Sequence, residues 1–168
     1  MRRPRRSPIT ALVAAGSLVA LTLGACGGGS VTTLSSPPTT DPGVTLGLIH
    51  SPSGPILATG NGNALYDFVP DTPTHSACTN DGCVFQWPPL LRTGPIRVAA
   101  GLNRALVGTL TRPDGSTQLS YGGHPLYTYD LDVQPGLITG QAIDQNGGLW
   151  YVLNAGGHEI HDSFSVQS

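Results

Sequence analysis

The stretch from Gly47 to Asp71 reads GLIHSPSGPILATGNGNALYDFVPD, and the stretch from Gly108 to Asp132 reads GTLTRPDGSTQLSYGGHPLYTYDLD. They align without a gap at a shift of 61 residues. The shared positions are Gly47/Gly108, Pro52/Pro113, Gly54/Gly115, Gly62/Gly123, Leu65/Leu126, Tyr66/Tyr127 and Asp71/Asp132, with an aromatic pair at Phe68/Tyr129. Similarity at a fixed period indicates a repeated supersecondary unit. We predict an internal duplication within residues 44–157, with unit one at about 44–91 and unit two at about 105–157.

Each predicted unit has the turn residues of short strands. Ser51–Gly54 and Arg112–Gly115 combine a proline, which presets φ, with a glycine, which tolerates positive φ. Gly60–Asn63 and Gly122–His124 mark a second chain reversal. The segments between these turns are rich in Leu, Ile, Thr and Tyr, whereas 15 prolines and 23 glycines disfavour long helices. We expect an all-β fold of two antiparallel units, each of about four short strands, packed as one compact domain, with a short helical turn within 99–107.

The third strand of each predicted unit alternates between aromatic and polar residues. Alternation places Tyr66 with Phe68 on one face, and Asp67 on the other. In unit two, the same pattern groups Tyr127, Tyr129 and Leu131 opposite Thr128. A fourth strand in each unit would carry Trp87 or Trp150.

Both third strands fit the pattern Tyr-x-(Phe/Trp/Tyr)-x-x-Asp, as Tyr66-Asp-Phe-Val-Pro-Asp71 and Tyr127-Thr-Tyr-Asp-Leu-Asp132. They occur with Cys78-x4-Cys83-x3-Trp87-Pro-Pro and with Gly123-His-Pro-Leu-Tyr127. In this combination the chain resembles the predicted lipoproteins with a conserved Yx(FWY)xxD motif, the secreted-repeat family, over about residues 44–156. The resemblance implies export, lipidation and a repeat architecture, and the family has no assigned biochemical activity. The C-terminal tail, residues 158–168, extends beyond it.

The motif residues are predicted to be structural. Two aromatic rings on one strand face each bury roughly 150–250 Å² in a small core. The aspartate that ends the strand, Asp71 or Asp132, can accept hydrogen bonds from loop N–H groups. The alternative is an exposed aromatic platform for sugar rings or peptides.

The N-terminus has the parts of a lipoprotein export signal. Four arginines between residues 2 and 6 precede an uncharged apolar stretch from Ile9 to Gly24, which ends in Leu23-Gly-Ala-Cys26. We predict a signal peptide at residues 1–25, lipidation of Cys26 and a flexible tether at 26–43. An uncleaved N-terminal anchor is the alternative, although the apolar run is shorter than the roughly 20 residues of a membrane span.

Composition argues against two classes of partner. Without the signal peptide, four arginines and no lysine remain against ten acidic residues, which disfavours binding to nucleic acid. The same scarcity leaves no basic patch for lipid headgroups, so we expect contact with the membrane only through the lipid on Cys26. A protein or glycan partner stays unspecified.

Cys78 and Cys83 are the remaining pair once Cys26 is lipidated, and we predict a structural disulfide between them, with Asn80–Gly82 forming a tight turn. A redox-active pair is the alternative, although its usual spacing is Cys-x-x-Cys.

We predict no catalytic residue, cofactor or metal site. His158-Glu-Ile-His161 could offer metal ligands, but residues i and i+3 of an extended segment face opposite ways. Asp130 and Asp132 could touch Ca²⁺ but lack a dense oxygen-ligand loop. His50, His75 and His124 are scattered, and we expect them on the surface or in turns. The favoured function is therefore a non-catalytic extracytoplasmic binding or envelope-associated module, and the alternative is a redox, metal-binding or hydrolytic protein with an unrecognised site.

Overall fold

The computed structural model describes residues 43–162. The predicted signal peptide and Cys26 lie outside the described residues, as do nearly all of the predicted tether and residues 163–168. Among the described residues, no helix combines the length and the apolar character that crossing a membrane requires.

Nine short strands dominate the described chain. The strands are β1 (Val44–Ser51), β2 (Gly54–Thr59), β3 (Tyr66–Phe68), β4 (Ile96–Val98), β5 (Val107–Thr111), β6 (Thr117–Tyr121), β7 (His124–Pro125), β8 (Ile143–Gln145) and β9 (Gly148–Val152). The helices are α1 (Asp81–Gln86) and the 3-10 turn η1 (Arg104–Leu106), the latter inside the range where a helical turn was expected. The all-β prediction is confirmed.

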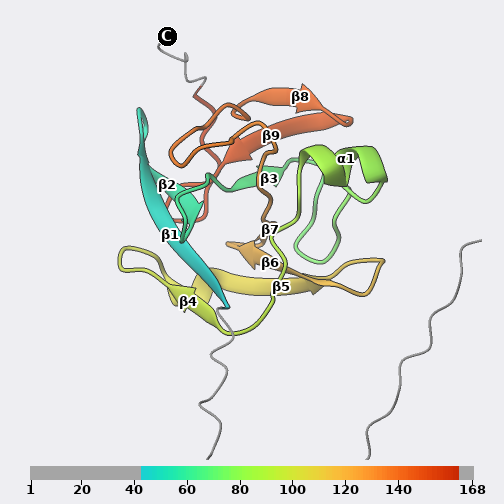
Figure 1. Ribbon diagram of the computed structural model, residues 1–168, viewed down its shortest axis with the longest axis horizontal. Coiled ribbons are helices and arrows are strands. Elements are labelled where there is room, and N and C mark those ends of the chain that lie inside the picture. Colours follow the sequence, from blue (N-terminus) through green and yellow to red (C-terminus); the bar gives the residue numbers. More distant parts are fainter. Residues whose placement is uncertain (1–42, 163–168) are drawn as a thin grey trace, which may run out of the picture. The chain divides into compact units, whose positions relative to one another are not determined.

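The strands form three sheets of three strands each, in the orders β2-β1-β4, β3-β9-β8 and β5-β6-β7. Every pairing between these strands is antiparallel except that of β1 with β4, which is parallel. Figure 1 shows β3-β9-β8 at one end of the domain and β5-β6-β7 at the other, with β1 and β2 along one flank and α1 on the opposite flank. The expectation of about four strands in each unit is not confirmed, because three strands fall within residues 44–91 and five within residues 105–157.

The predicted turns close the hairpins. Ser51 faces Gly54 across the β1–β2 turn, where Gly54 has φ of 100°. Gly122 and Gly123 join β6 to β7 with φ of 62° and 90°, values that a two-residue hairpin turn requires and that glycine adopts without strain.

Trp87 was expected on a strand, but it ends the helix α1. The side chain of Asn80 accepts a hydrogen bond from the N–H of Cys83 at 3.0 Å and so caps the helix, where a tight turn was expected. The Trp87 N–H still bonds to the Cys83 carbonyl at 2.8 Å. Pro88 and Pro89 follow, and because proline has no N–H, the helix cannot continue. Trp150, by contrast, lies on β9 as expected.

The second aromatic segment is also less regular than expected. Tyr127 forms only isolated bridges, with Tyr66 and with Pro89, and the chain then turns, with the Asp132 N–H bonded to the Tyr129 carbonyl at 3.1 Å. Because this turn ends the alternation, Leu131 does not share the face of Tyr127 and is 59% exposed. Asp67 lies opposite the aromatic face as predicted, but it is buried.

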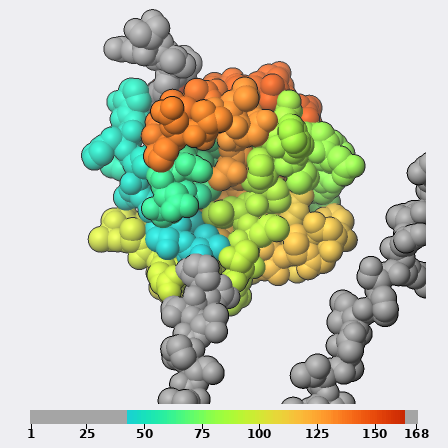
Figure 2. All heavy atoms as spheres, viewed as in Figure 1, coloured from blue at the N-terminus to red at the C-terminus, as the bar shows by residue number. Residues whose placement is uncertain are grey.

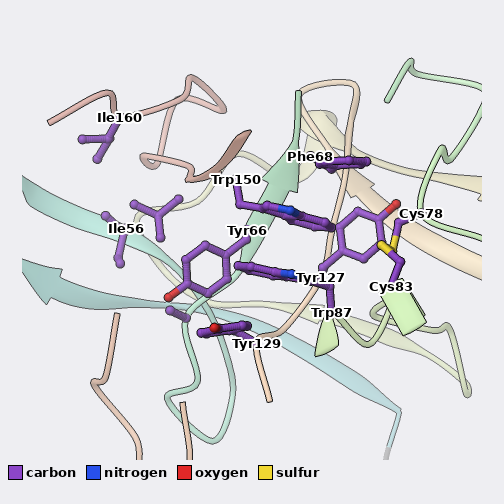
Figure 3. Packing of buried hydrophobic residues seen from close by; sticks show 12 residues of the cluster. Ile56, Tyr66, Phe68, Cys78, Cys83, Trp87, Tyr127, Tyr129, Trp150 and Ile160 are labelled. Carbon is purple, nitrogen blue, oxygen red and sulfur yellow. A yellow bond between two sulfur atoms is a disulfide. The ribbon is translucent and has the colours of Figure 1, made fainter. Parts of the chain in front are cut away.

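Four rings stack in an aromatic column, defined as Phe68, Trp150, Trp87 and Tyr129 in that order. The successive centroids are 4.2, 3.9 and 4.1 Å apart. Figure 3 shows the two indole planes lying parallel at the centre, with the rings of Tyr66 and Tyr127 beside them. The ring plane of Tyr66 makes an angle of 80° with Trp87, and that of Tyr127 makes an angle of 88° with Trp150. Each of the motif aromatics is at most 7% exposed, so the expectation of core residues is confirmed and the exposed platform is wrong.

Contacts across the two predicted units are reciprocal. Phe68 of unit one stacks on Trp150 of unit two, and Tyr129 of unit two stacks on Trp87 of unit one. The two units nevertheless differ in secondary structure. Trp150 of unit two lies on the strand β9, whereas Trp87 of unit one directly follows the helix α1. The division into repeated units stays a prediction.

The C-terminal third of the domain is held between earlier segments. The Gly136 N–H bonds to the Gly62 carbonyl at 2.9 Å, and the Asn146 amide bonds to Gln86 at 3.3 Å. Figure 2 accordingly shows orange surface between the cyan surface of β1 and β2 and the green surface around α1. A second apolar cluster lies apart from the aromatic column and contains Leu46, Leu57, Leu65, Leu119, Tyr121, Leu126 and Leu153.

Candidate functional site

The two motif tyrosines hold each other's aspartates. Tyr66 and Tyr127 exchange both backbone N–H···O hydrogen bonds at 2.9 Å. The Tyr66 hydroxyl then donates to Oδ2 of Asp132 at 2.6 Å, while the Tyr127 hydroxyl donates to Oδ2 of Asp71, also at 2.6 Å. The two motifs are therefore joined by reciprocal hydrogen bonds, because the tyrosine of each motif donates to the aspartate that ends the other motif.

The second oxygen of each aspartate ties down a loop. Oδ1 of Asp71 accepts the Ala77 N–H at 2.7 Å, and Oδ1 of Asp132 accepts the Thr139 N–H at 2.9 Å. These bonds are the loop contacts that the sequence predicts for both aspartates. Burial, followed by the charge of Asp132, raises the pKa of Tyr66, so its hydroxyl stays protonated and donates. The tyrosine partners of the aspartates were not predicted.

The predicted disulfide between Cys78 and Cys83 is confirmed, with 5.5 Å between the Cα atoms. Both cysteines are fully buried. The carbonyl of Cys78 accepts a hydrogen bond from the guanidinium of Arg112 at 2.6 Å, and the same guanidinium donates to Ser76 at 2.9 Å. The disulfide is thus fixed beside a buried polar network rather than presented at the surface.

A cluster of titratable side chains lies on the other side of β3 from the aromatic column. Oδ2 of Asp67 lies 3.1 Å from Nδ1 of His124, which comes from β7. Oε1 of Glu159 lies 4.0 Å from the same His124 nitrogen. We call Asp67, His124 and Glu159 the carboxylate–histidine cluster. Glu159 also contacts His161, whose Nε2 is 3.2 Å from Oε2.

The carboxylate–histidine cluster borders a cleft of about 280 Å³, which we call the β3–β7 cleft. Its wall also includes Asp71, Pro73, Gly122, Gly123 and Pro125. At the β6–β7 turn, a Cβ added to Gly123 would lie 3.5 Å from Pro73, another residue of the wall, so glycine at this position leaves space in the cleft. The side chain of Asp67 is 2% exposed at the floor of the cleft, whereas that of His124 is 31% exposed.

Proton affinity within the cluster is raised. Burial raises the pKa of Asp67 to about 6, against the hydrogen bond from His124 that lowers it. The hydrogen bond to Asp67 raises the pKa of His124, with the charge of Glu159 adding in the same direction. Both shifts favour a proton shared between the imidazole and the buried carboxylate.

The structure corrects the expectation for one histidine and separates the other candidates. His124 was expected to be a scattered surface or turn residue, but it meets Asp67 across 57 positions of sequence. Of the tail segment, Glu159 and His161 are brought together, and His158 is not part of the cluster. Asp132 has both oxygens engaged by Tyr66 and Thr139, and the one metal-ligand group found among the described residues contains neither Asp130 nor Asp132.

Among the comparisons with known proteins, only the one with family models found a match. Residues 108–154 match the model of a family described as a secreted repeat of unknown function. The matched range runs from β5 to just past β9 and contains Tyr127, Asp132 and Trp150. No curated protein and no solved structure matched the chain. The similarity to the family of secreted repeats of unknown function therefore covers residues 108–154 of this chain.

Proposed function

We propose that the chain is an exported lipoprotein, anchored through lipid on Cys26, that acts outside the cytoplasm as a non-catalytic binding module. The family of secreted repeats and the Cys78–Cys83 disulfide support a location outside the cytoplasm, where disulfides persist. The arginine-rich start, the short apolar run and Leu23-Gly-Ala-Cys26 support the lipid anchor.

The observation that carries the binding role is the buried carboxylate at the floor of the β3–β7 cleft. Asp67 is 1% exposed and its Oδ1 has no hydrogen-bond partner, so the fold leaves one charged oxygen unsatisfied beside an open space. Burying an unsatisfied carboxylate oxygen costs free energy, and a positively charged ligand in the cleft would recover it. The described residues that line the cleft include no Ser, Thr, Cys or Lys, which supports binding over covalent catalysis by a hydroxyl, thiol or amine nucleophile.

The anchor is tested by replacing its acceptor. Cys26→Ser should leave the exported chain unlipidated and move it from the detergent phase to the aqueous phase on partitioning, because the two or more acyl chains expected on Cys26 supply the membrane affinity. Equal partitioning of Cys26→Ser and the unaltered protein would contradict the anchor.

The binding role is tested by thermal denaturation of the protein, freed of metals, with a panel of metal ions and small organic cations. A ligand at about 100 times its Kd stabilises the folded state by about 2.7 kcal/mol. Stabilisation should disappear in Glu159→Gln, which removes one charge from the cleft wall and leaves the core intact. A panel in which nothing stabilises the protein would contradict the binding role.

A further inference from the structure

We infer that Asp67, His124 and Glu159 bind one divalent transition-metal ion of the zinc class in the β3–β7 cleft. This inference rests on the binding role proposed above and names the ligand of the same cleft. It also revises the sequence-based expectation that the chain has no metal site.

The distances between the ligand atoms of the three side chains are close to those of a metal site. Their ligand atoms all lie within 4.8 Å of one another, and the two contacts to His124 Nδ1 measure 3.1 and 4.0 Å. Zinc binds histidine nitrogen and carboxylate oxygen at about 2.0–2.2 Å in a tetrahedron, whose ligand atoms are roughly 3.3–3.5 Å apart. Glu159 would need to move inward by about 1 Å, and its side chain is 22% exposed, so the core does not have to rearrange.

An independent observation points to a cation at this place. Oδ1 of Asp67 is one of three buried side-chain polar atoms that lack a hydrogen-bond partner among the described residues. Only 1% of the surface of Asp67 is exposed, and the residue lines the cleft. The ligand set thus includes a carboxylate that has already lost its water and has one oxygen free to coordinate.

Charge at the cluster favours the same ligand. Asp67, Glu159 and the neighbouring Asp71 all line the cleft, and His124 is the one cationic group that the lining residues can supply. A proton on Nδ1 of His124, which lies 3.1 Å from Asp67 and 4.0 Å from Glu159, would sit between the two carboxylates of the cluster. A divalent ion would take that place and release the proton, because a coordinating imidazole must be neutral at the ligating nitrogen.

The two predicted units differ at these titratable residues. The gapless alignment of the two predicted units pairs Asp67 with Thr128 and His124 with Asn63. The aromatic column and the two tyrosine–aspartate bonds are built at both sets of positions, whereas the acid and the histidine occur at one. A structural role common to both halves therefore does not explain Asp67 and His124.

One nitrogen and two carboxylate oxygens favour zinc-like ions over Ca²⁺ or Mg²⁺, which prefer oxygen ligands alone. Three protein ligands leave a coordination position for water or a small ligand, and the cleft provides the space. His161 Nε2 lies 3.2 Å from the second Glu159 oxygen and would orient that ligand from the outer sphere.

The test is calorimetric titration of the exported protein, held in detergent and freed of metal with EDTA, with ZnCl₂ near neutral pH. We expect one Zn²⁺ per chain, with affinity falling as the pH is lowered and unaffected by excess Mg²⁺. Glu159→Gln and His124→Gln should each weaken binding at least tenfold. The matched controls His50→Gln and His158→Gln, which alter histidines outside the cluster, should bind Zn²⁺ as the unaltered protein does.

Two outcomes would overturn the metal site. The first is no stoichiometric binding of Zn²⁺ by a protein that is folded. The second is binding that survives His124→Gln and Glu159→Gln but is lost in His158→Gln, which would place the ion on the tail. If Zn²⁺ fails while a small organic cation stabilises the protein through Glu159, the metal inference fails and the proposed binding role stands.

Discussion

Removing the hydroxyl of Tyr66 isolates the contact that joins the two motifs. In Tyr66→Phe the ring keeps its edge-on contact with Trp87, whose centroid is 5.4 Å away, so the core retains its packing. The variant loses the 2.6 Å hydrogen bond to Asp132 and the 3.2 Å bond in which the hydroxyl accepts the Gly140 N–H. Asp132 is 5% exposed, so water does not readily replace the missing donor.

The expected loss follows from the charge and burial of the acceptor. A hydrogen bond to a charged group contributes about 1.5–3 kcal/mol, and an unpaired buried N–H adds about 1 kcal/mol. Tyr66→Phe should therefore lower the free energy of unfolding by about 2–4 kcal/mol. Tyr127→Phe should cost less, about 1–2 kcal/mol, because its acceptor Asp71 is less buried than Asp132.

Urea denaturation followed by tryptophan fluorescence measures both losses. Tyr151→Phe is the matched control, because the half-buried Tyr151 lies on β9 outside the crossed motif contacts and its ring contacts His161, and it should change stability by less than about 0.5 kcal/mol. A double-mutant cycle with Asp132→Asn should show coupling of about 1 kcal/mol or more. Unchanged urea midpoints for Tyr66→Phe, or no coupling with Asp132, would show that the crossed motif contacts do not stabilise the fold.

Phe68→Ala and Tyr129→Ala, at the two ends of the aromatic column, should each cost about 3–5 kcal/mol in urea melts, and melts matching the unaltered protein would contradict burial of the column. Replacing Cys78 and Cys83 together by Ala should cost about 2 kcal/mol, because the disulfide closes a short loop, and an equal melt of both proteins would contradict a stabilising role. In metal-free buffer, stability should rise as the pH falls from about 7 to 4, since the raised pKa of Asp67 lets the folded state bind a proton more tightly than the unfolded state. Asp67→Asn should flatten that dependence by about 2 kcal/mol, and an unchanged pH profile would contradict the raised pKa.

Local signals in the sequence were enough to predict the strands and turns. Proline and glycine at Ser51–Gly54 and Gly122–His124 mark hairpins because their backbone preferences act within a few residues. The burial of Tyr66, Phe68, Tyr127 and Tyr129 followed from their alternation and from the hydrophobic area of the rings. The prediction failed at Trp87, where the cap from Asn80 and the two following prolines produce a helix instead of a strand.

The carboxylate–histidine cluster could not be predicted from such signals. Asp67 and His124 are brought together because Tyr66 bridges to Tyr127, a pairing between residues 61 positions apart. Glu159 reaches the same place through the bridge between Leu153 and Glu159 in the C-terminal segment. Asp, His and Glu are common on protein surfaces, so none of the three residues stands out by itself. The pairings between distant segments that bring them together cannot be read from a single sequence. The one sequence signal was the unequal pair at Asp67 and Thr128 within an otherwise matching alignment.

The histidine ring signals in an NMR spectrum test the metal site at the level of the single residue. The chain has five histidines, and substitution assigns the signal of His124 among them. In metal-free protein the His124 signal should titrate with a pKa above the ordinary value of about 6.5. One equivalent of Zn²⁺ should shift the His124 signal and abolish its titration, while the signals of His50, His75 and His158 stay in place. A His124 signal that Zn²⁺ leaves unmoved, with the protein folded and its disulfide intact, would contradict a metal site in the β3–β7 cleft.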